Sequence, residues 1–185
     1  DKLTVRKLNF TPGHREKFWH KNCVAIGMAA GFLEPLEASA LVLVELAAAK
    51  ISKEMPINRQ SMEILSHRFN KQFLYRWERI IAFLKMHYIL SKRTDTAFWR
   101  DNYNPETIPD SLQELITLWK YQPPAPHDFE RIDEIFPSAS WQYILYGMGF
   151  ETKDALLSRK FINEDKANYF FNENIQLTKK YLSAL

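Results

Sequence analysis

The residues best placed for chemistry are two glutamates in the stretch GFLEPLEASALVLVELAAAK, residues 31–50. If a helix begins here, its first-turn amides lack intrahelical partners and its dipole is positive at this end, which suits an anion. Glu34 is then an ordinary helix cap. Glu37, at about the third helical position, has two interpretations. It is either a capping-box residue that returns to the backbone, which the residues alone favour, or a functional carboxylate beside a bound anion.

The other reactive side chains form no recognisable site. The histidines are scattered, and no pair combines i, i+4 spacing with a carboxylate on the same helical face; they are His14, His20, His67, His87 and His127. His20 lies three residues from Cys23, but two ligands favour a structural interpretation. The sequence contains neither G-x-S-x-G nor a glycine-rich phosphate loop. We therefore predict no metal site.

The composition predicts one globular domain. A length of 185 residues allows one domain with a core, and contents of 46% hydrophobic and 14% aromatic residues exclude a disordered chain. The net charge of +3 gives no argument for nucleic acid or an anionic membrane, and no stretch predicts a membrane span or signal peptide. Cys23 is the only cysteine, which excludes an internal disulfide and makes the cytoplasm the expected location.

Strand patterns are confined to the start of the chain, at residues 3–10 and, as a buried strand, at 22–27. A helix with proline at its first position is predicted over 34–53, and an apolar stripe predicts a long core helix over 58–92. The basic residues between its apolar positions favour a solvated face over nucleic-acid binding. Shorter helices are expected at 95–102, 109–119, 128–135, 138–148 and 163–183, with a stiff proline-rich linker at 121–126.

These elements predict a mainly α fold with one or two short N-terminal strands. Two strands cannot form a sheet that is covered by helices on both faces. Two alternatives follow from this count. Either the fold is a helical assembly with a small β appendage, or the rest of the sheet lies outside this sequence.

The segment FWHKNCVAIGMAAGFLEPLEASALVLVE, residues 18–45, resembles the signature region of the tryptophan halogenase family of flavin-dependent halogenases. A looser similarity continues through residues 69–102 and 140–150. The resemblance implies that the chain is the C-terminal third of such an enzyme. Residues 1–33 would then be the last strands and the flavin-side turn of an FAD-binding α+β domain, and 34–185 a helical substrate-box domain.

In that family, reduced FAD and dioxygen oxidise a bound chloride or bromide, and the hypohalous product reaches a lysine beside an aromatic substrate. The resemblance implies that Glu37 is the catalytic partner of that lysine and that the backbone amides of Ser39 and Ala40 hold the halide. It also places the flavin against the turn, with Gly31 allowing a close approach. The implied flavin-binding residues are Gly27, Ala30, Gly31, Pro35 and Leu36.

Several family features are absent from these residues: the dinucleotide-binding fingerprint, the W-x-W-x-I-P motif and the lysine. We therefore expect an N-terminal FAD domain outside this chain, and no halogenation by these residues alone. Met28 stands where related flavin proteins often have aspartate, and residues 103–185 offer no convincing match to the groups that hold free tryptophan. The substrate is thus an aromatic small molecule, of which an indole is one candidate.

The expected partners are a separate flavin reductase and the absent FAD domain, with a second copy of the chain as a further candidate. Two alternatives remain from the sequence: a non-enzymatic helical module that binds an apolar ligand or partner, and a generic flavin-dependent monooxygenase. The fragment interpretation predicts exposed apolar surface near residues 22–45, where the absent sheet would pack.

Overall fold

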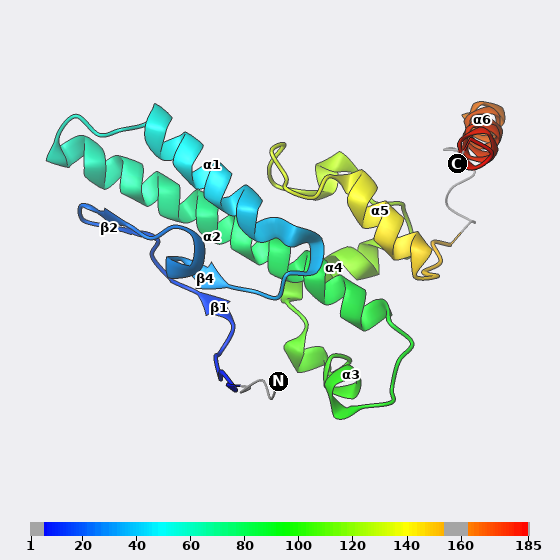
Figure 1. Ribbon diagram of the computed structural model, residues 1–185, viewed down its shortest axis with the longest axis horizontal. Coiled ribbons are helices and arrows are strands. Elements are labelled where there is room, and N and C mark those ends of the chain that lie inside the picture. The colour runs from blue at the N-terminus through cyan, green and yellow to red at the C-terminus, as the bar shows by residue number, and fades with distance from the viewer. Residues whose placement is uncertain (1–5, 154–162, 185) are drawn as a thin grey trace, which may run out of the picture.

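The computed structural model describes residues 6–153 and 163–184, and its architecture is mainly helical, as predicted (Figure 1). Two long helices lie side by side: α1 (Ser39–Lys53) and α2 (Arg59–Leu90). The start of α2 is fixed by a capping box, in which the Asn58 side chain accepts a hydrogen bond from the Ser61 amide at 2.8 Å and Ser61 Oγ accepts one from the Asn58 amide at 3.2 Å. The long core helix expected over 58–92 is therefore confirmed.

Short antiparallel ribbons precede these helices. β1 (Gly13–His14) pairs with β4 (Gly31–Phe32), and β2 (Trp19–His20) pairs with β3 (Cys23–Val24). Asn70 of α2 ties the second ribbon to the helix, because its Oδ1 accepts hydrogen bonds from the amides of Phe18 and Trp19 at 2.8 and 2.7 Å. The ribbon is therefore held in place by a side chain of α2 and not by further strands of a sheet.

Both predicted strands need correction. Residues 6–10 of the segment expected at 3–10 are exposed and have no regular secondary structure, while residues 3–5 lie outside the described residues. Within 22–27 only Cys23–Val24 is strand, and Cys23 is exposed. Each strand of these ribbons is only two residues long.

The first helix also begins later than predicted. A 3-10 turn, η2 (Leu36–Ala38), precedes α1, and the α-helix starts only at Ser39. The reason is local backbone geometry, because Glu37 and Ala38 have φ angles of 66° and 50°, in the left-handed region. Pro35 is consequently not the first residue of the α-helix, and Glu37 is not in its first turn.

In the part of the chain that the structure describes, the helices that follow α2 are α3 (Ala97–Asp101), α4 (Asp110–Trp119), α5 (Ser138–Gly147) and α6 (Glu164–Leu182). Other 3-10 turns are η1 (Gly27–Ala29), η3 (Pro105–Thr107) and η4 (Pro126–Asp128). The expected helices over 95–102, 109–119, 138–148 and 163–183 are thus confirmed within a few residues at each end.

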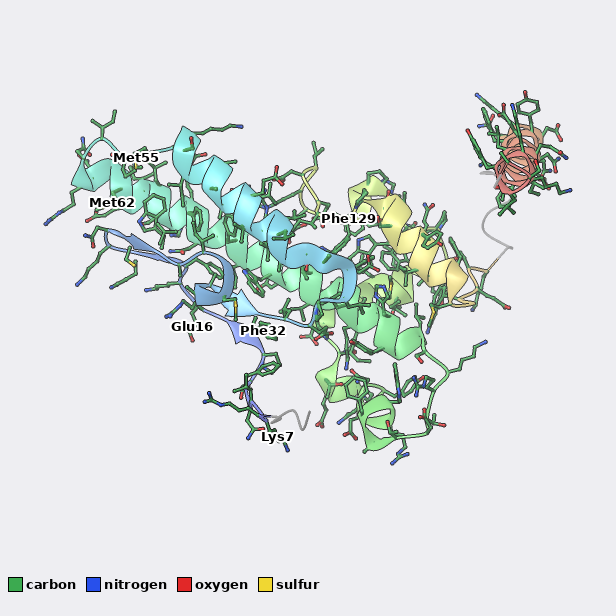
Figure 2. The ribbon with its side chains drawn as sticks, in the orientation of Figure 1. Lys7, Glu16, Phe32, Met55, Met62 and Phe129 are labelled. Carbon is green, nitrogen blue, oxygen red and sulfur yellow. The ribbon has the colours of Figure 1, made fainter. Side chains whose placement is uncertain are left out.

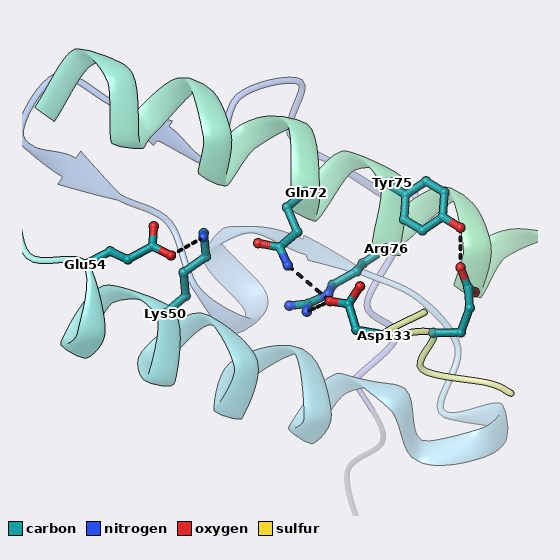
Figure 3. A network of polar contacts seen from close by, with 7 residues as sticks. Lys50, Glu54, Gln72, Tyr75, Arg76 and Asp133 are labelled. Carbon is teal, nitrogen blue, oxygen red and sulfur yellow. Dashed lines mark hydrogen bonds and ion pairs between the residues drawn. The ribbon is translucent and has the colours of Figure 1, made fainter. Parts of the chain in front are cut away.

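The prediction of a helix over 128–135 is wrong. Only η4 is helical there, and the following residues are held in an irregular path by pairing with α2 (Figure 3). Arg76 Nη2 lies 3.0 Å from Asp133 Oδ2, and Arg79 Nε lies 3.3 Å from Glu134 Oε2. Glu134 also accepts a hydrogen bond from the Tyr75 hydroxyl. The segment therefore gains its polar partners from a distant helix and not from its own turns.

The hydrophobic core has two clusters that share α2. One gathers the stripe of α2 with the ribbons and α1, and includes Phe18, Leu43, Phe69, Phe73 and Trp77. The other joins the later part of α2 to α4 and α5 through fully buried side chains, among them Phe83, Leu112, Trp119 and Trp141.

The proline-rich segment at 121–126 is packed into the protein and does not separate two units. Pro124 is fully buried, and its carbonyl accepts a hydrogen bond from Gln142 of α5 at 2.6 Å. The neighbouring Asp128 accepts one from Trp119 Nε1 at 2.9 Å. Within residues 6–153 and 163–184, no helix has both the length and the hydropathy that a bilayer crossing requires.

Candidate functional site

Residues of the turn over 34–40 line two separate hollows. The first has a volume of about 430 Å³ and is bounded by the η1–β4 segment, the start of α1 and the Phe73 and Trp77 rings of α2. The second has a volume of about 330 Å³ and lies between Glu37, Phe83 and α5. Residues that the sequence grouped into one site therefore face two different spaces.

The first hollow gathers most of the residues implied for flavin and halide binding. Its wall includes Gly27, Ala30, Gly31, Pro35, Ser39 and Ala40, so these six lie together. Leu36 is not part of that wall, and Glu37 faces the second hollow instead. The wall is largely apolar, and these small residues leave room on their side for a flat aromatic ring system to lie against the backbone.

Two glycines of this wall are required for separate reasons. Gly27 has a φ angle of 60°, which only glycine adopts without strain. At Gly31 a Cβ atom would lie 2.7 Å from the Gly13 carbonyl oxygen and 2.7 Å from the His14 Cα atom. The close approach that Gly31 allows in this structure is thus that of β1 to β4.

The backbone of Glu37 and Ala38 is strained. A left-handed conformation costs a residue with a side chain about 1–2 kcal/mol, and here two such residues are consecutive. Strained residues of this kind concentrate at functional sites, where the surrounding structure holds them in place. The turn directs the Glu37 side chain toward α2 and leaves Ser39 and Ala40 as the first residues of α1, whose amides have no i−4 partner within that helix.

Glu37 is held by His87 of α2. Glu37 Oε1 lies 3.0 Å from His87 Nε2, and His87 Nδ1 lies 2.9 Å from the Phe83 carbonyl oxygen one turn earlier in the helix. The His87 side chain is mostly buried, with 16% of its surface exposed, and 34% of the Glu37 side chain is exposed. Glu37 is therefore fixed by a tertiary contact, and the capping-box interpretation is wrong.

The hydrogen bonds of His87 define its tautomer. A carbonyl oxygen can only accept, so Nδ1 carries a hydrogen. In the neutral ring the lone pair of Nε2 then faces Glu37 Oε1 across 3.0 Å, where it can accept a proton from that side chain.

The first glutamate of the pair is also held by α2. Glu34 borders the first hollow and its carboxylate interacts with Tyr88, the residue that follows His87. Burial, reinforced by the nearby carboxylate of Glu34, raises the pKa of Tyr88 to about 12. The two glutamates of the turn therefore contact two adjacent residues of one helix, which fixes the turn at both ends.

The wall of the second hollow comes mainly from α5. Ala139, Ser140, Tyr143 and Ile144 line it together with Glu37 and Phe83. Trp141, also of α5, packs in the second core, where the Arg79 guanidinium lies 4.7 Å from the ring centroids of both Trp141 and Phe129. Phe129 is labelled in Figure 2. These stacked planes support α5 and keep its lining residues in place.

Exposed apolar side chains surround the first hollow, as the fragment interpretation predicts. Met28 is 83% exposed and Leu41 is 79% exposed, and Phe32, Val42 and Val44 add partly exposed apolar area on the same segment. A cluster of large exposed apolar side chains is typical of a surface that binds another protein part, a membrane or a ligand. Within residues 6–153 and 163–184, no three potential ligands among His, Cys, Asp and Glu come together to hold a metal ion.

Solved halogenase structures share this fold. A tryptophan halogenase from Shewanella frigidimarina NCIMB 400 gives a TM-score of 0.85 at 43% identity, over 97% of this chain and 34% of that chain. BrvH, a flavin-dependent halogenase from Brevundimonas sp. BAL3, gives a TM-score of 0.70 at 37% identity, over 82% of this chain and 30% of that chain. The architecture is thus the helical region found in flavin-dependent halogenases.

Sequence comparison agrees. The family model for tryptophan halogenase matches residues 1–172, so the chain belongs to the tryptophan halogenase family. The tryptophan 6-halogenase SttH of Streptomyces toxytricini is 31% identical over 137 residues, which are 74% of this chain and 26% of SttH. The tryptophan 7-halogenase RebH of Lentzea aerocolonigenes is 31% identical over 116 residues, 63% of this chain and 22% of RebH. The chain therefore spans about a quarter of the length of these curated relatives.

Sequence reasoning missed His87 and Tyr88 as partners of the two glutamates. Both lie in the predicted long helix, but His87 is 50 residues from Glu37, a separation at which no spacing rule pairs two side chains. Their adjacency was the available signal, since His87 and Tyr88 are neighbouring polar residues near the C-terminal end of that helix.

Proposed function

We propose that this chain is the C-terminal, helical part of a flavin-dependent halogenase, which halogenates an aromatic substrate with reduced FAD, dioxygen and chloride or bromide. In this proposal residues 1–33 close the FAD-binding domain and residues 34–185 form the substrate-box domain. The observation that carries it is the turn over 34–40, which borders a largely apolar hollow through Pro35, Ser39 and Ala40 and presents the Glu37 carboxylate to a second hollow.

The first hollow is assigned to the flavin and the halide. When bound, reduced FAD supplies, with dioxygen, the oxidising power that the halide requires. Gly27, Ala30 and Gly31 offer backbone without bulky side chains, and the amides of Ser39 and Ala40 begin a helix, where the dipole favours an anion. Leu36 lies outside this wall, and we assign it no contact with the flavin.

The second hollow is assigned to the substrate. Replacement of hydrogen by halogen at an aromatic carbon forms a carbon–halogen bond and releases a proton from the same carbon. Glu37 faces this space and is the group of the turn that can accept that proton. His87 can then take the proton from Glu37 through their 3.0 Å contact, which restores the carboxylate. We assign His87 as a positioning residue because it acts through Glu37.

The experiment compares Glu37→Gln with wild type in the full-length protein, supplied with a flavin reductase, halide and an indole substrate. Loss of a general base lowers rates by about 10²–10⁴-fold, so product formation should fall by that factor. Flavin binding, followed by absorbance, should persist because Glu37 faces away from the first hollow. Glu45→Gln on the exposed surface of α1 is the matched control and should retain activity.

Three outcomes separate the proposal from its rivals. Retained halogenation by Glu37→Gln would remove the role assigned to this carboxylate. Hydroxylated product formed without any dependence on chloride or bromide would indicate a generic flavin monooxygenase. A wild-type protein that binds no flavin would favour a non-enzymatic helical module. We also propose that the 185 residues alone are inactive, which the same assay tests directly, and that the protein acts in the cytoplasm.

A further inference from the structure

The apolar side chains of helix α6 are not buried against any other part of the described structure. It has 19 residues, Glu164–Leu182, all of them described and every one exposed. Figure 1 shows α6 apart from the bundle of α1 to α5. Phe171 is 73% exposed and Tyr181 is 68% exposed, values unusual for aromatic residues of a folded domain.

The residues of α6 separate into two faces. At about 100° per residue, the large apolar side chains fall within one half of the helix: Phe170, Phe171, Ile175, Leu177, Tyr181 and Leu182. The opposite half carries most of the charges, including Asp165, Lys166, Glu173 and Lys180, with Tyr169 as the apolar exception. This is the pattern of a helix that packs one side against a protein surface.

A helix of this kind requires a partner. Isolated helices of fewer than about 12–15 residues are marginal in water, and longer ones still depend on packing of their apolar face. The residues of α6 include several that are weak helix formers, among them Phe170, Phe171 and Tyr181. Its order is therefore explained by a surface that lies outside the described residues.

Comparison with a longer chain indicates where that surface is. The match to the Shewanella frigidimarina structure covers 97% of this chain and so omits about 6 residues, fewer than the 19 of α6. Most of α6 therefore lies within the region that matches the other chain. The match accounts for 34% of that chain, so about two thirds of it lies outside the matched region.

The charges of α6 argue against a membrane surface. The helix has three acidic and three basic residues, whereas helices that lie on anionic membranes carry an excess of lysine and arginine. Asn174 and Thr178 also lie within the apolar half, where they would be buried among acyl chains. A protein surface with some polar groups fits this face better.

We propose that the apolar face of α6 docks on the flavin-binding part of the full-length polypeptide, the part that precedes residue 1. This inference rests on the proposed function, because it requires that part to exist. The exposed side chains around Met28 and Leu41 meet the same part at a second place. The helical region is then attached at both ends, by the turn over 34–40 and by α6.

Photo-cross-linking of the full-length protein tests the docking directly. p-Benzoylphenylalanine replaces Phe171 on the apolar face in one protein and Gln176 on the opposite face in the other. After irradiation, the probe at 171 should be joined to peptides that precede residue 1, at the mass of a single polypeptide. The probe at 176 should give no such product. Phenylalanine is replaced by a similar aromatic side chain, so folding should be retained and is checked by flavin absorbance.

Three results would overturn the docking. The first is a cross-link at twice the polypeptide mass, which would place a second copy on this face. The second is a cross-link only to α1 to α5. The third is equal amounts of product from the probes at 171 and 176. Halogenation by the wild-type protein is assayed in parallel. A cross-link in a protein that does not halogenate would support the docking and refute the proposed function. Halogenation without the cross-link would support the proposed function and refute the docking.

Discussion

Because Ala38 has a left-handed conformation, we predict that replacing it with glycine increases the stability of the protein. Ala38 has a φ angle of 50° and is exposed, so removal of its methyl group loses little packing. Ala38→Gly should relieve about 1–2 kcal/mol of backbone strain. The more flexible unfolded chain offsets about 0.4–1 kcal/mol of this gain. The net effect is a stabilisation of about 1 kcal/mol.

Ala48→Gly is the matched control, since Ala48 is exposed in the middle of α1. There the same substitution should destabilise by about 1 kcal/mol, because glycine is a poor helix former. For a protein of this size, 1 kcal/mol corresponds to a shift of about 2–4 °C in Tm. Thermal unfolding of the three proteins side by side should therefore give shifts of opposite sign. A fall in Tm for Ala38→Gly as large as that for Ala48→Gly would refute the left-handed geometry.

Two further predictions concern the same region. Gly31→Ala places a methyl group 2.7 Å from the backbone of β1 and should destabilise by about 1–3 kcal/mol, whereas Gly147→Ala meets nothing within 4 Å and should be neutral or stabilising in thermal unfolding. Because burial and Glu34 raise the pKa of Tyr88 to about 12 from 10.0, its contribution to stability should be present below pH 10 and be lost as the pH rises through 12. In an NMR titration of the labelled tyrosine ring, Glu34→Gln should lower this pKa, and an unchanged titration curve would contradict the contact.

The sequence predicted the helices whose pattern is local. The stripe through Phe69, Phe73 and Trp77 repeats at helical spacing, so α2 was predicted within two residues at each end. The helix expected over 128–135 failed because Asp133 and Glu134 pair with residues of α2 that lie 57 and 55 positions earlier. Local propensity contains no information about partners at that distance.

The candidate site divides in the same way. Motif resemblance placed Gly27, Ala30, Gly31, Pro35, Ser39 and Ala40 together, and they do line one hollow. The left-handed pair could not be predicted, since glutamate and alanine both favour right-handed helices and give no signal for positive φ. That pair delays the start of α1 and directs Glu37 to the other side of the turn, where His87 holds it.

The sharing of α2 between the two hollows affects how such a protein can diversify. Phe73 and Trp77 border the first hollow and Phe83 borders the second, so a change in the packing of α2 disturbs both at once. The residues of α5 border the second hollow alone. Substitutions at Ser140 or Tyr143 can therefore reshape one space and leave the other intact. The second hollow can therefore change through α5 alone, whereas changes in α2 affect both hollows.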